Sequence, residues 1–319
     1  MVNDFQPLVS ICCITYNHEN YIKDAIEGFL VQKTDFPIEI IIRDDASTDK
    51  TADIVRLYQA EHPNLISTIF HTKNQYSLGI RPFPEVFMKA SGKYIALCEG
   101  DDYWTDPLKL QKQVDFLESH PEFAICCHGV TFKYEDERPD HYGGFLRPKR
   151  NEYSIRDLCI VGFISTCSTV FRNHLFEEIP QELRNLAMGD WAVHILNAEH
   201  GKIWFIDKNM ATYRVHGSGV WTRMDPIKKK KKVIEAYFKI NKYLGRKYEK
   251  EIMTGVWGYW LKIAEISAGQ GSYKQARRYY WKCIRNINYK GKFSYNLLIK
   301  DFIKIHFPAL IKHGTELNV

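Results

Sequence analysis

The stretch from Tyr94 to Pro107, YIALCEGDDYWTDP, decides how this chain is organised. An apolar run, Tyr94 to Cys98, ends abruptly in Glu99, Gly100, Asp101 and Asp102. Such a run is typical of a strand buried in a parallel sheet, and open α/β sheets bind ligands at the carboxyl ends of their strands. Adjacent carboxylates repel each other, so a neighbouring cation stabilises them. A phosphate-carrying Mg²⁺ or Mn²⁺ is one such cation, because these metals prefer hard oxygen ligands; the alternative is a pair of solvated turn residues.

The composition is that of an ordinary globular protein. The chain has 319 residues, 45% of them apolar and 26% charged, which suffices for one large domain with an appendage. The net charge of +6, partly in the run from Lys228 to Lys232, is compatible with an anionic nucleotide substrate or a membrane surface. It is too small to indicate a nucleic-acid-binding protein.

The eight cysteines show no metal-binding or disulfide spacing. The adjacent pairs Cys12–Cys13 and Cys126–Cys127 lie inside apolar runs, which predicts buried free thiols in a reducing compartment. No basic segment precedes the first apolar run, and no run approaches the roughly 18 to 20 residues of a membrane-spanning helix. We therefore expect a cytoplasmic protein that is at most peripheral on the inner face of the membrane.

Strands and helices alternate through the first half of the chain. Apolar, β-branched runs predict strands over residues 8–15, 38–43, 65–71 and 94–98, and amphipathic periodicity predicts helices between them. This alternation indicates an α/β fold with a mostly parallel sheet flanked by helices. Since the carboxyl ends of parallel strands share one edge, we expect Thr15, Asp45 and Asp101 to converge there.

The later segments complete one domain and begin another. We predict strands over 123–130, 165–171, 203–206 and 211–216, helices over 108–118 and from Gly189, and a loop over 133–150 that is either a lid or plain surface. The hydroxyl groups of 165–171 are expected to face an acceptor. We place a catalytic domain at 1–222 and a C-terminal helical region at 223–319, with a helical hairpin (257–268 and 272–287) and an amphipathic tail (293–311).

Three motifs together resemble a known family. SICCITYN at 10–17, RDDASTD at 43–49 and EGDD at 99–102 are similar, in order and spacing, to the signature of family 2 glycosyltransferases with the GT-A (Rossmann-like) fold. The resemblance covers about the first 130 residues and extends loosely to 222. It implies an inverting enzyme that uses Mn²⁺ or Mg²⁺. This enzyme would move a sugar from a nucleotide-diphosphate sugar, expected to be UDP-linked, to a hydroxyl of a saccharide or lipid-linked acceptor in surface polysaccharide or cell-envelope glycan synthesis.

The resemblance also assigns residues to the donor. Thr15, Tyr16 and Asp45 correspond to positions that hold the nucleotide base and ribose, and Glu19 is a further candidate contact. Asn74 and Arg81 lie where relatives contact the diphosphate or the base. For the acids, the alternative is capping of the helices that follow.

The remaining assignments concern the metal, the diphosphate and the sugar. Asp102 is expected to bind the metal and Asp101 to contact the ribose or a metal-bound water. His216, from the late YRVH segment, would complete the metal shell or meet the diphosphate, and Arg214 would bind the diphosphate. Trp104 either lines the sugar pocket or is a packed aromatic beside it.

Asp190 is the expected general base. Inversion requires one carboxylate to take the proton of the attacking hydroxyl, and the resemblance places that role at the Gly189-Asp190-Trp191 segment. A helix N-cap is the alternative role of Asp190, and the two roles are compatible.

Two other functions remain open at the level of sequence. A nucleotidyltransferase also sets acids at a sheet edge, but the first loop, Thr15 to Asn20, has neither the glycines nor the Lys or Arg that grip a triphosphate. A non-catalytic nucleotide-sugar-binding module is the other. The C-terminal helices are expected to pack on the catalytic domain, on a membrane surface or on a second subunit.

Overall fold

The computed structural model describes residues 6–136, 138–142, 150–217, 219, 221–291 and 295–306. It divides into two compact units, one of Met1–Leu158 with Gly162–Thr222 and one of Cys159–Val161 with Arg223–Val319. Residues 143–149 of the predicted loop, and residues 293–294 and 307–311 of the predicted tail, lie outside the described residues.

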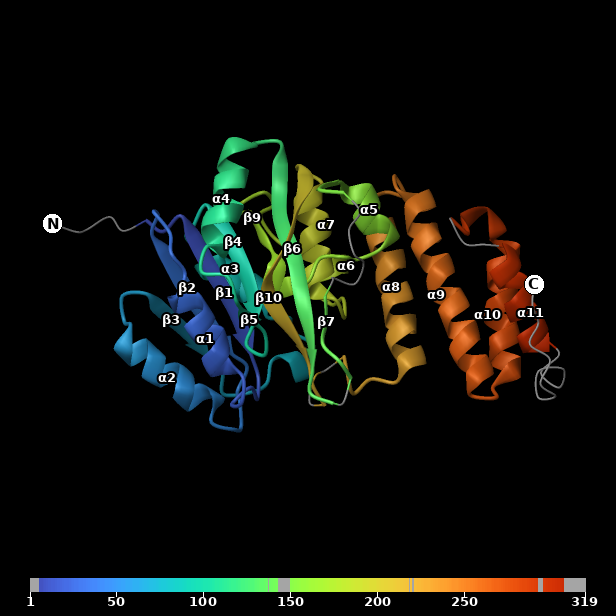
Figure 1. Cartoon of the computed structure of the whole chain (residues 1–319), viewed down its shortest axis with the longest axis horizontal. Coiled ribbons are helices and arrows are strands. Elements are labelled where there is room, and N and C mark those ends of the chain that lie inside the picture. The colour runs from blue at the N-terminus through green and yellow to red at the C-terminus, as the bar shows by residue number, and fades with distance from the viewer. Residues whose placement is uncertain are drawn as a thin grey trace. The chain divides into compact units, whose positions relative to one another are not determined.

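The first unit is built on a mixed, mostly parallel sheet, as the sequence predicts (Figure 1). The described strands are β1 (Val9–Thr15), β2 (Ile38–Asp44), β3 (Ile66–Phe70), β4 (Tyr94–Glu99), β5 (Tyr103–Trp104), β6 (Phe123–Tyr134), β7 (His141–Tyr142), β8 (Glu152–Tyr153), β9 (Val170–Arg172) and β10 (Lys202–Val215). Their order is β3-β2-β1-β4-β9-β6-β10-β5, with β7 beside β6 and β8 beside β10. β1 pairs in parallel with both β2 and β4, so Thr15, Asp44 and Glu99 end neighbouring strands at one edge.

Helices flank this sheet because each carries one apolar face. The helices of the first unit are α1 (Ile22–Leu30), α2 (Thr51–Glu61), α3 (Phe83–Lys89), α4 (Lys109–Ser119), α5 (Ile155–Ile160, whose last two residues belong to the second unit), α6 (Gln181–Arg184) and α7 (Gly189–Ala198). In α1, for example, Ile22, Ile26 and Phe29 are fully buried, while the strands contribute residues such as Ile11 and Ala96 to the same core.

The predicted strand 165–171 is wrong in detail. Residues 165–171 do not form one strand: Thr166–Ser168 is a 3₁₀ turn (η2), and only Val170–Arg172 pairs with the sheet. The hydroxyls of Ser168 and Thr169 donate to the carbonyl oxygen of Ser165, at 2.7 and 3.2 Å. Local bonds of this kind favour a turn over a strand.

The segments predicted as strands 203–206 and 211–216 are one strand, β10. Polar Asp207, Lys208 and Asn209 interrupt the apolar pattern, but the pairing with β6 continues past them through shifts of register between Ile206 and Ala211. A bulge of this kind absorbs extra residues without ending a strand. β6 also runs four residues further than predicted, to Tyr134 instead of 130.

The second unit is helical. It contains α8 (Pro226–Tyr243), α9 (Glu249–Gly269), α10 (Tyr273–Arg285) and α11 (Tyr295–His306), with a short 3₁₀ turn η3 (Ile287–Tyr289). α9 begins at Glu249, earlier than the predicted 257, because Ile252 and Val256 continue the buried stripe of its apolar face. Within the described part of the chain, no helix is long and apolar enough to cross a bilayer.

Candidate active site

The loop after β4 lies against the end of β1 through a glycine. The Gly100 N–H donates to the carbonyl oxygen of Ile14 at 2.9 Å. A Cβ atom at Gly100 would lie only 2.7 Å from the Thr15 hydroxyl oxygen and 3.0 Å from Ile22 Cδ1. Glycine is therefore the residue that allows the acidic loop to approach β1, and Thr15 is buried at this contact.

Four carboxylates gather at this edge of the sheet. Burial raises the pKa of Glu99 well above its usual range, and the charges of Asp101, Asp102 and Asp190 raise it further. Burial, followed by the charge of Asp101, likewise raises the pKa of Asp102. Burial and the same four acids raise the pKa of the Tyr213 phenol, so this side chain from β10 faces the cluster. Carboxylates this close together repel one another when they are ionised, so a cation bound among them stabilises their charged forms.

Two histidines face Asp101. Its Oδ2 atom lies 2.9 Å from His216 Nε2 and 3.7 Å from His18 Nε2. Burial acts to raise the pKa of Asp101, but the two imidazoles outweigh it and the pKa is lowered. Asp101 is therefore the anionic member of the cluster, with a side chain that is 21% exposed.

Asp102 is buried more deeply than its neighbour, at 1% exposure. Its Oδ1 accepts the Arg214 N–H at 2.9 Å, and the Cys167 thiol stabilises the charged carboxylate. Its Oδ2 has no nitrogen or oxygen partner among the residues that the structure describes. Carboxylate oxygens with an adjacent imidazole fit a divalent cation chemically, although the described residues include no group of three or more Asp, Glu, His or Cys arranged as a complete ligand set.

The Arg214 guanidinium is held by the protein. It forms an ion pair with Asp24, and its Nη1 donates to the Asp101 carbonyl at 3.2 Å. The guanidinium carbon also lies 4.4 Å from the centre of the Tyr103 ring. Its contact with a diphosphate stays a prediction, because these partners occupy much of its surface.

Asp190 lies in the first turn of α7 but not at its cap. Met188 occupies the N-cap position, so the capping alternative does not describe this residue. The Thr166 hydroxyl donates to Asp190 Oδ2 at 3.3 Å. Burial raises the pKa of the Asp190 carboxyl, which brings it toward the range in which a carboxylate accepts a proton near neutral pH.

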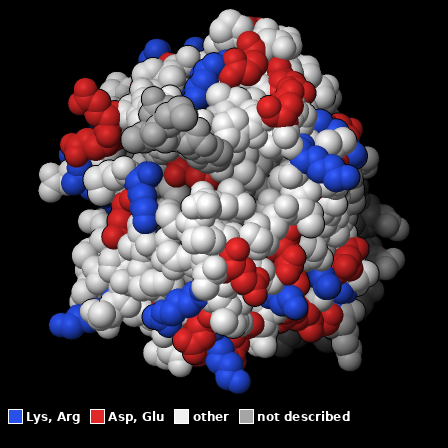
Figure 2. Space-filling model, turned by 90° about the vertical axis from the view of Figure 1, so that its left-hand side faces the viewer, with Lys and Arg blue, Asp and Glu red and all other residues white. Residues whose placement is uncertain are grey.

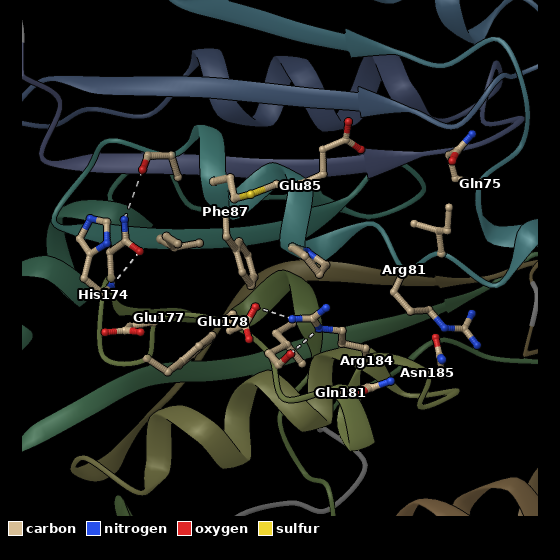
Figure 3. A pocket seen from close by; sticks show the side chains of 18 of the residues that line it. Gln75, Arg81, Glu85, Phe87, His174, Glu177, Glu178, Gln181, Arg184 and Asn185 are labelled. Carbon is tan, nitrogen blue, oxygen red and sulfur yellow. Dashed lines mark hydrogen bonds and ion pairs between the residues drawn. The ribbon is translucent and has the colours of Figure 1, made fainter.

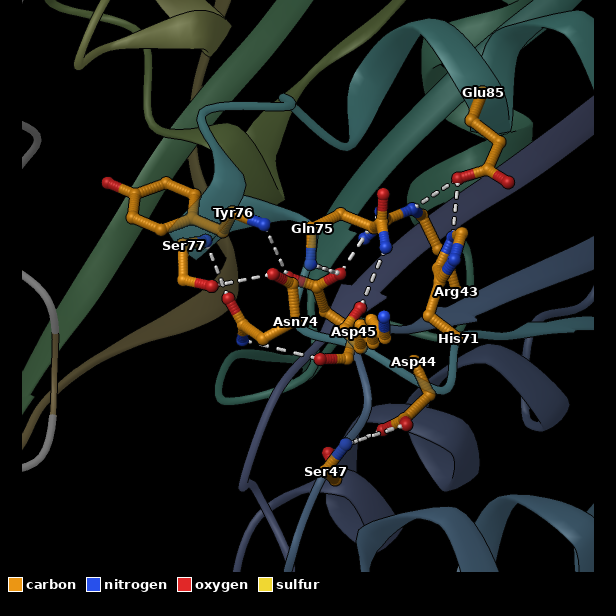
Figure 4. Close-up of polar contacts among 11 residues, drawn as sticks. Arg43, Asp44, Asp45, Ser47, His71, Asn74, Gln75, Tyr76, Ser77 and Glu85 are labelled. Atoms are coloured by element: carbon orange, nitrogen blue, oxygen red, sulfur yellow. Dashed lines mark hydrogen bonds and ion pairs between the residues drawn. The ribbon is translucent and has the colours of Figure 1, made fainter.

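The Asp45 carboxylate organises the loop after β3 (Figure 4). Its Oδ1 and Oδ2 accept the backbone N–H groups of Gln75 and Tyr76, both at 3.0 Å. Oδ1 also lies 3.1 Å from Nη2 of Arg43, a residue that is 1% exposed and whose Nε donates to Glu85 at 2.7 Å. Asp45 is thus both the partner of a buried cation and the anchor of the loop.

The other predicted donor contacts surround this network. Asn74 Nδ2 donates to the Asp45 carbonyl at 3.3 Å, and Tyr16 is 40% exposed at the end of β1. Glu19 accepts the Lys50 N–H at 3.0 Å, just before α2 begins, so it joins the first loop to the second, and its contact with the nucleotide stays a prediction.

Arg81 borders an open cavity (Figure 3). Its guanidinium carbon stacks 4.4 Å from the centre of the Tyr76 ring, while Nε and Nη1 are buried without a hydrogen-bond partner in the described part of the chain. The cavity, about 1000 Å³, runs along α3 to the segment 173–185, with Arg81 and Asn185 at one end and His174 at the other. An unpaired guanidinium beside the donor loop suits an anionic ligand.

Trp104 is packed in the core. It is 3% exposed, its Nε1 donates to the Cys167 carbonyl at 2.9 Å, and its ring contacts Phe29 and Lys109. This placement favours the packed-aromatic alternative.

The site includes three side chains beyond those the motifs assign: His18, Glu99 and Tyr213. Glu99 was visible in the quoted EGDD motif and Tyr213 in the YRVH segment, so their position beside assigned residues was the available signal. His18 had no such signal, because its contact with Asp101 depends on where the first loop folds.

Comparisons with known proteins agree on the family. The model of "Glycosyl transferase family 2" matches residues 10–180. "Uncharacterized protein Rv1520" of Mycobacterium tuberculosis is 43% identical over 215 residues, 67% of this chain and 60% of the relative, so the chain spans about 60% of that relative's length. "UDP-Glc:alpha-D-GlcNAc-diphosphoundecaprenol beta-1,3-glucosyltransferase WfaP" of Escherichia coli is 38% identical over 117 residues, 36% of this chain and 43% of the relative.

A solved structure shares the fold. The mannosyltransferase PcManGT from Pyrobaculum calidifontis, in complex with GDP-Man and Mn²⁺, aligns with a TM-score of 0.53 and 15% identity over 97% of this chain and 88% of that chain. The predicted GT-A class is thereby confirmed.

Proposed function

The chain belongs to glycosyl transferase family 2, and from this premise we propose an inverting, metal-dependent transferase that moves a sugar from a nucleotide-diphosphate donor to an acceptor hydroxyl. The observation that carries the proposal is the acid cluster at the carboxyl end of β4, in which Asp101 and Asp102 offer carboxylate oxygens to a cation and Asp190 is a further carboxylate of raised pKa. We propose residues 1–222 as the catalytic domain and 223–319 as its helical appendage.

We propose UDP as the nucleotide and a lipid-linked saccharide as the acceptor. The support comes from WfaP, whose name gives a UDP-linked donor and a diphosphoundecaprenol-linked acceptor. On the same support, we propose cell-envelope glycan synthesis as the process that this reaction serves. The eight buried free thiols support a reducing, cytoplasmic location.

In the proposed reaction, Asp190 holds the acceptor hydroxyl and takes its proton as the oxygen attacks the anomeric carbon. The bond from that carbon to the diphosphate oxygen breaks on the opposite face, the nucleoside diphosphate leaves with the electron pair, and the configuration inverts. Thr15, Tyr16 and Asp45 would orient the base and ribose, and Arg81 would face the diphosphate.

Asp102 and His216, with Asp101 beside them, would hold the divalent metal. When bound, the metal supplies charge neutralisation for the leaving diphosphate. No covalent intermediate on the protein is needed.

The test is calorimetric titration of UDP into the chain with and without Mn²⁺, repeated on Asp102→Ala. We expect Mn²⁺ to strengthen UDP binding in the natural chain and to have little effect in the variant. Metal-independent binding that the substitution leaves unchanged would refute the metal site. GDP serves as the base control, and equal affinity for UDP and GDP would refute the choice of uracil.

A further inference from the structure

The positive charge of the chain is concentrated in its helical part. Residues 223–319 contain 22 Lys and Arg against 7 Asp and Glu, a net charge of +15, whereas the whole chain carries +6. By contrast, the face of the molecule in Figure 2 mixes acidic and basic side chains without a block of one sign.

α10 presents the densest part of this charge. Its 13 residues, YKQARRYYWKCIR, include five Lys or Arg and no acid. Its buried side chains are Ala276, Tyr280 and Cys283, which face α9 or α11: the Tyr280 hydroxyl donates to the Leu298 carbonyl at 2.9 Å, and the Cys283 carbonyl accepts from Trp257 at 2.9 Å.

The opposite side of α10 is an exposed face of four cations around one tryptophan, here called the basic face. At about 100° per residue, its members fall within an arc of about 100°. All are exposed to solvent, and they are Lys274, Arg277, Arg278, Trp281 and Arg285.

The basic face has four cations, Lys274, Arg277, Arg278 and Arg285, and the described residues offer them no acidic partner. Among the described residues, none of the four forms an ion pair, and like charges four apart on a helix repel. Trp281 lies at the centre of the face with 46% of its surface exposed, which is unusual for so large an apolar side chain. In the described part of the chain, the His306 ring meets the Trp281 ring edge-on, with centroids 6.0 Å apart, and no acid pairs with the four cations.

We propose that the basic face of α10 docks on an anionic lipid bilayer. Arg and Lys near a surface of negatively charged lipids each gain attraction, and an indole ring is stabilised at the boundary between headgroups and acyl chains. A helix with one apolar face packed on its own unit would then lie along the surface, with Trp281 inserted at headgroup level. The inference concerns the helical unit alone and does not depend on the proposed transfer reaction.

A nucleic acid is the competing anionic partner. The lipid surface is favoured because the face offers one centrally placed tryptophan among cations that span a single stripe, a geometry that fits a plane better than a groove.

The test is flotation of the full chain with vesicles of phosphatidylcholine, alone or with about 30% phosphatidylglycerol, at low and physiological salt. We expect binding only to the anionic vesicles, weakened by salt. Replacing three cations, in Arg277→Gln/Arg278→Gln/Arg285→Gln, should lower the partition coefficient on the order of 100-fold, since each contributes about fivefold. Trp281→Ala should lower it further without changing the salt dependence.

The matched control is Lys242→Gln/Lys247→Gln/Lys250→Gln, which removes the same charge from exposed positions of α8, α9 and the turn between them. We expect this control to retain most of the binding. Equal loss in the two triple variants would refute a specific face, and stronger binding to a duplex oligonucleotide than to anionic vesicles at the same salt would refute the lipid partner. UDP titration of the α10 variant, expected to match the natural chain, separates a failure here from a failure of the proposed reaction.

Discussion

At the scale of single residues, the site assigns different tasks to acids that look alike in the sequence. Asp101 is paired with imidazoles and has a lowered pKa, while burial raises the pKa of Asp102 and Asp190. The EGDD motif indicates where such acids meet but not which is ionised, because that depends on His18 and His216 arriving from distant segments.

Asp190→Asn should abolish most transfer. Asparagine cannot accept the proton of the acceptor hydroxyl, so we expect kcat to fall roughly 10² to 10⁴-fold while UDP affinity is kept. In the natural chain, activity should rise with pH through a pKa above the usual carboxyl range, because burial holds Asp190 protonated at lower pH. Rates measured from pH 5 to 8 check both points.

The control for this variant is Glu182→Gln, an exposed carboxylate of α6. It should leave the rate and its pH profile unchanged. Full transfer activity in Asp190→Asn would show that Asp190 is not the general base.

Lys109 is a second residue whose protonation state the sequence does not reveal. It is fully buried, its Nζ lies 4.0 Å from the Trp104 ring, and it has no hydrogen-bond partner among the described residues. Burial lowers its pKa to about 7. Lysine is rarely buried without a partner, so the sequence alone gives no sign of this placement.

At pH values between the folded-state pKa of Lys109, about 7, and its unfolded value of about 10.4, the unfolded chain binds a proton that the folded chain lacks. The free energy of unfolding should therefore rise with pH over this window, by up to about 1.4 kcal/mol per unit. Lys109→Met should be more stable than the natural chain at pH 7, with the gain vanishing toward pH 10. Urea unfolding at pH 7 to 10 tests this, with exposed Lys23→Met as control, and a gain that is independent of pH would contradict it.

At the scale of elements, the sequence predicts regular segments better than their ends. β1, β2 and β4 are continuous apolar runs and lie where expected. Residues 165–171 alternate apolar and polar side chains like a strand, yet hydroxyl bonds to the Ser165 carbonyl make part of them a turn. β10 is the converse case, in which a bulge carries one strand past a polar interruption. Whether such a segment forms a strand or a turn is decided by its pairing with distant strands, which the local sequence does not show.

The loop after β3 depends on Asp45. Asp45→Asn removes the charge beside buried Arg43 and puts a donor where the N–H groups of Gln75 and Tyr76 need acceptors. We expect the free energy of unfolding to fall by about 2 to 4 kcal/mol without ligand. UDP affinity should fall as well, because the loop leads to Arg81.

A residue that only contacted the nucleotide base would leave the stability of the unliganded chain unchanged. Denaturant unfolding without UDP therefore distinguishes anchoring from direct contact alone. Asp53→Asn, which breaks an exposed ion pair with Arg56, is the matched loss of charge and should cost less than about 1 kcal/mol.

At the scale of the whole molecule, the two parts of the chain differ in charge. Residues 1–222 contain 22 Lys and Arg against 31 Asp and Glu, a net charge of −9, opposite in sign to the +15 of residues 223–319. The net value of +6 hides this division, which is why overall composition indicates only a mildly basic protein.

The concentration of positive charge predicts how the helical unit responds to salt. Its cations repel one another in the folded state. Salt screens the repulsion between exposed charges that are farther apart than the Debye length, which is about 10 Å at 0.1 M and shortens as salt is added. Raising NaCl from about 20 mM to about 500 mM should therefore slow hydrogen exchange in α8, α9 and α10. Mass spectrometry of peptides from each unit separates this effect from general changes.

Arg277→Gln/Arg278→Gln/Arg285→Gln should reduce the salt response, because it removes three of the mutually repelling charges. Faster exchange at high salt would mean that ion pairs such as Lys239–Glu235 outweigh the repulsion.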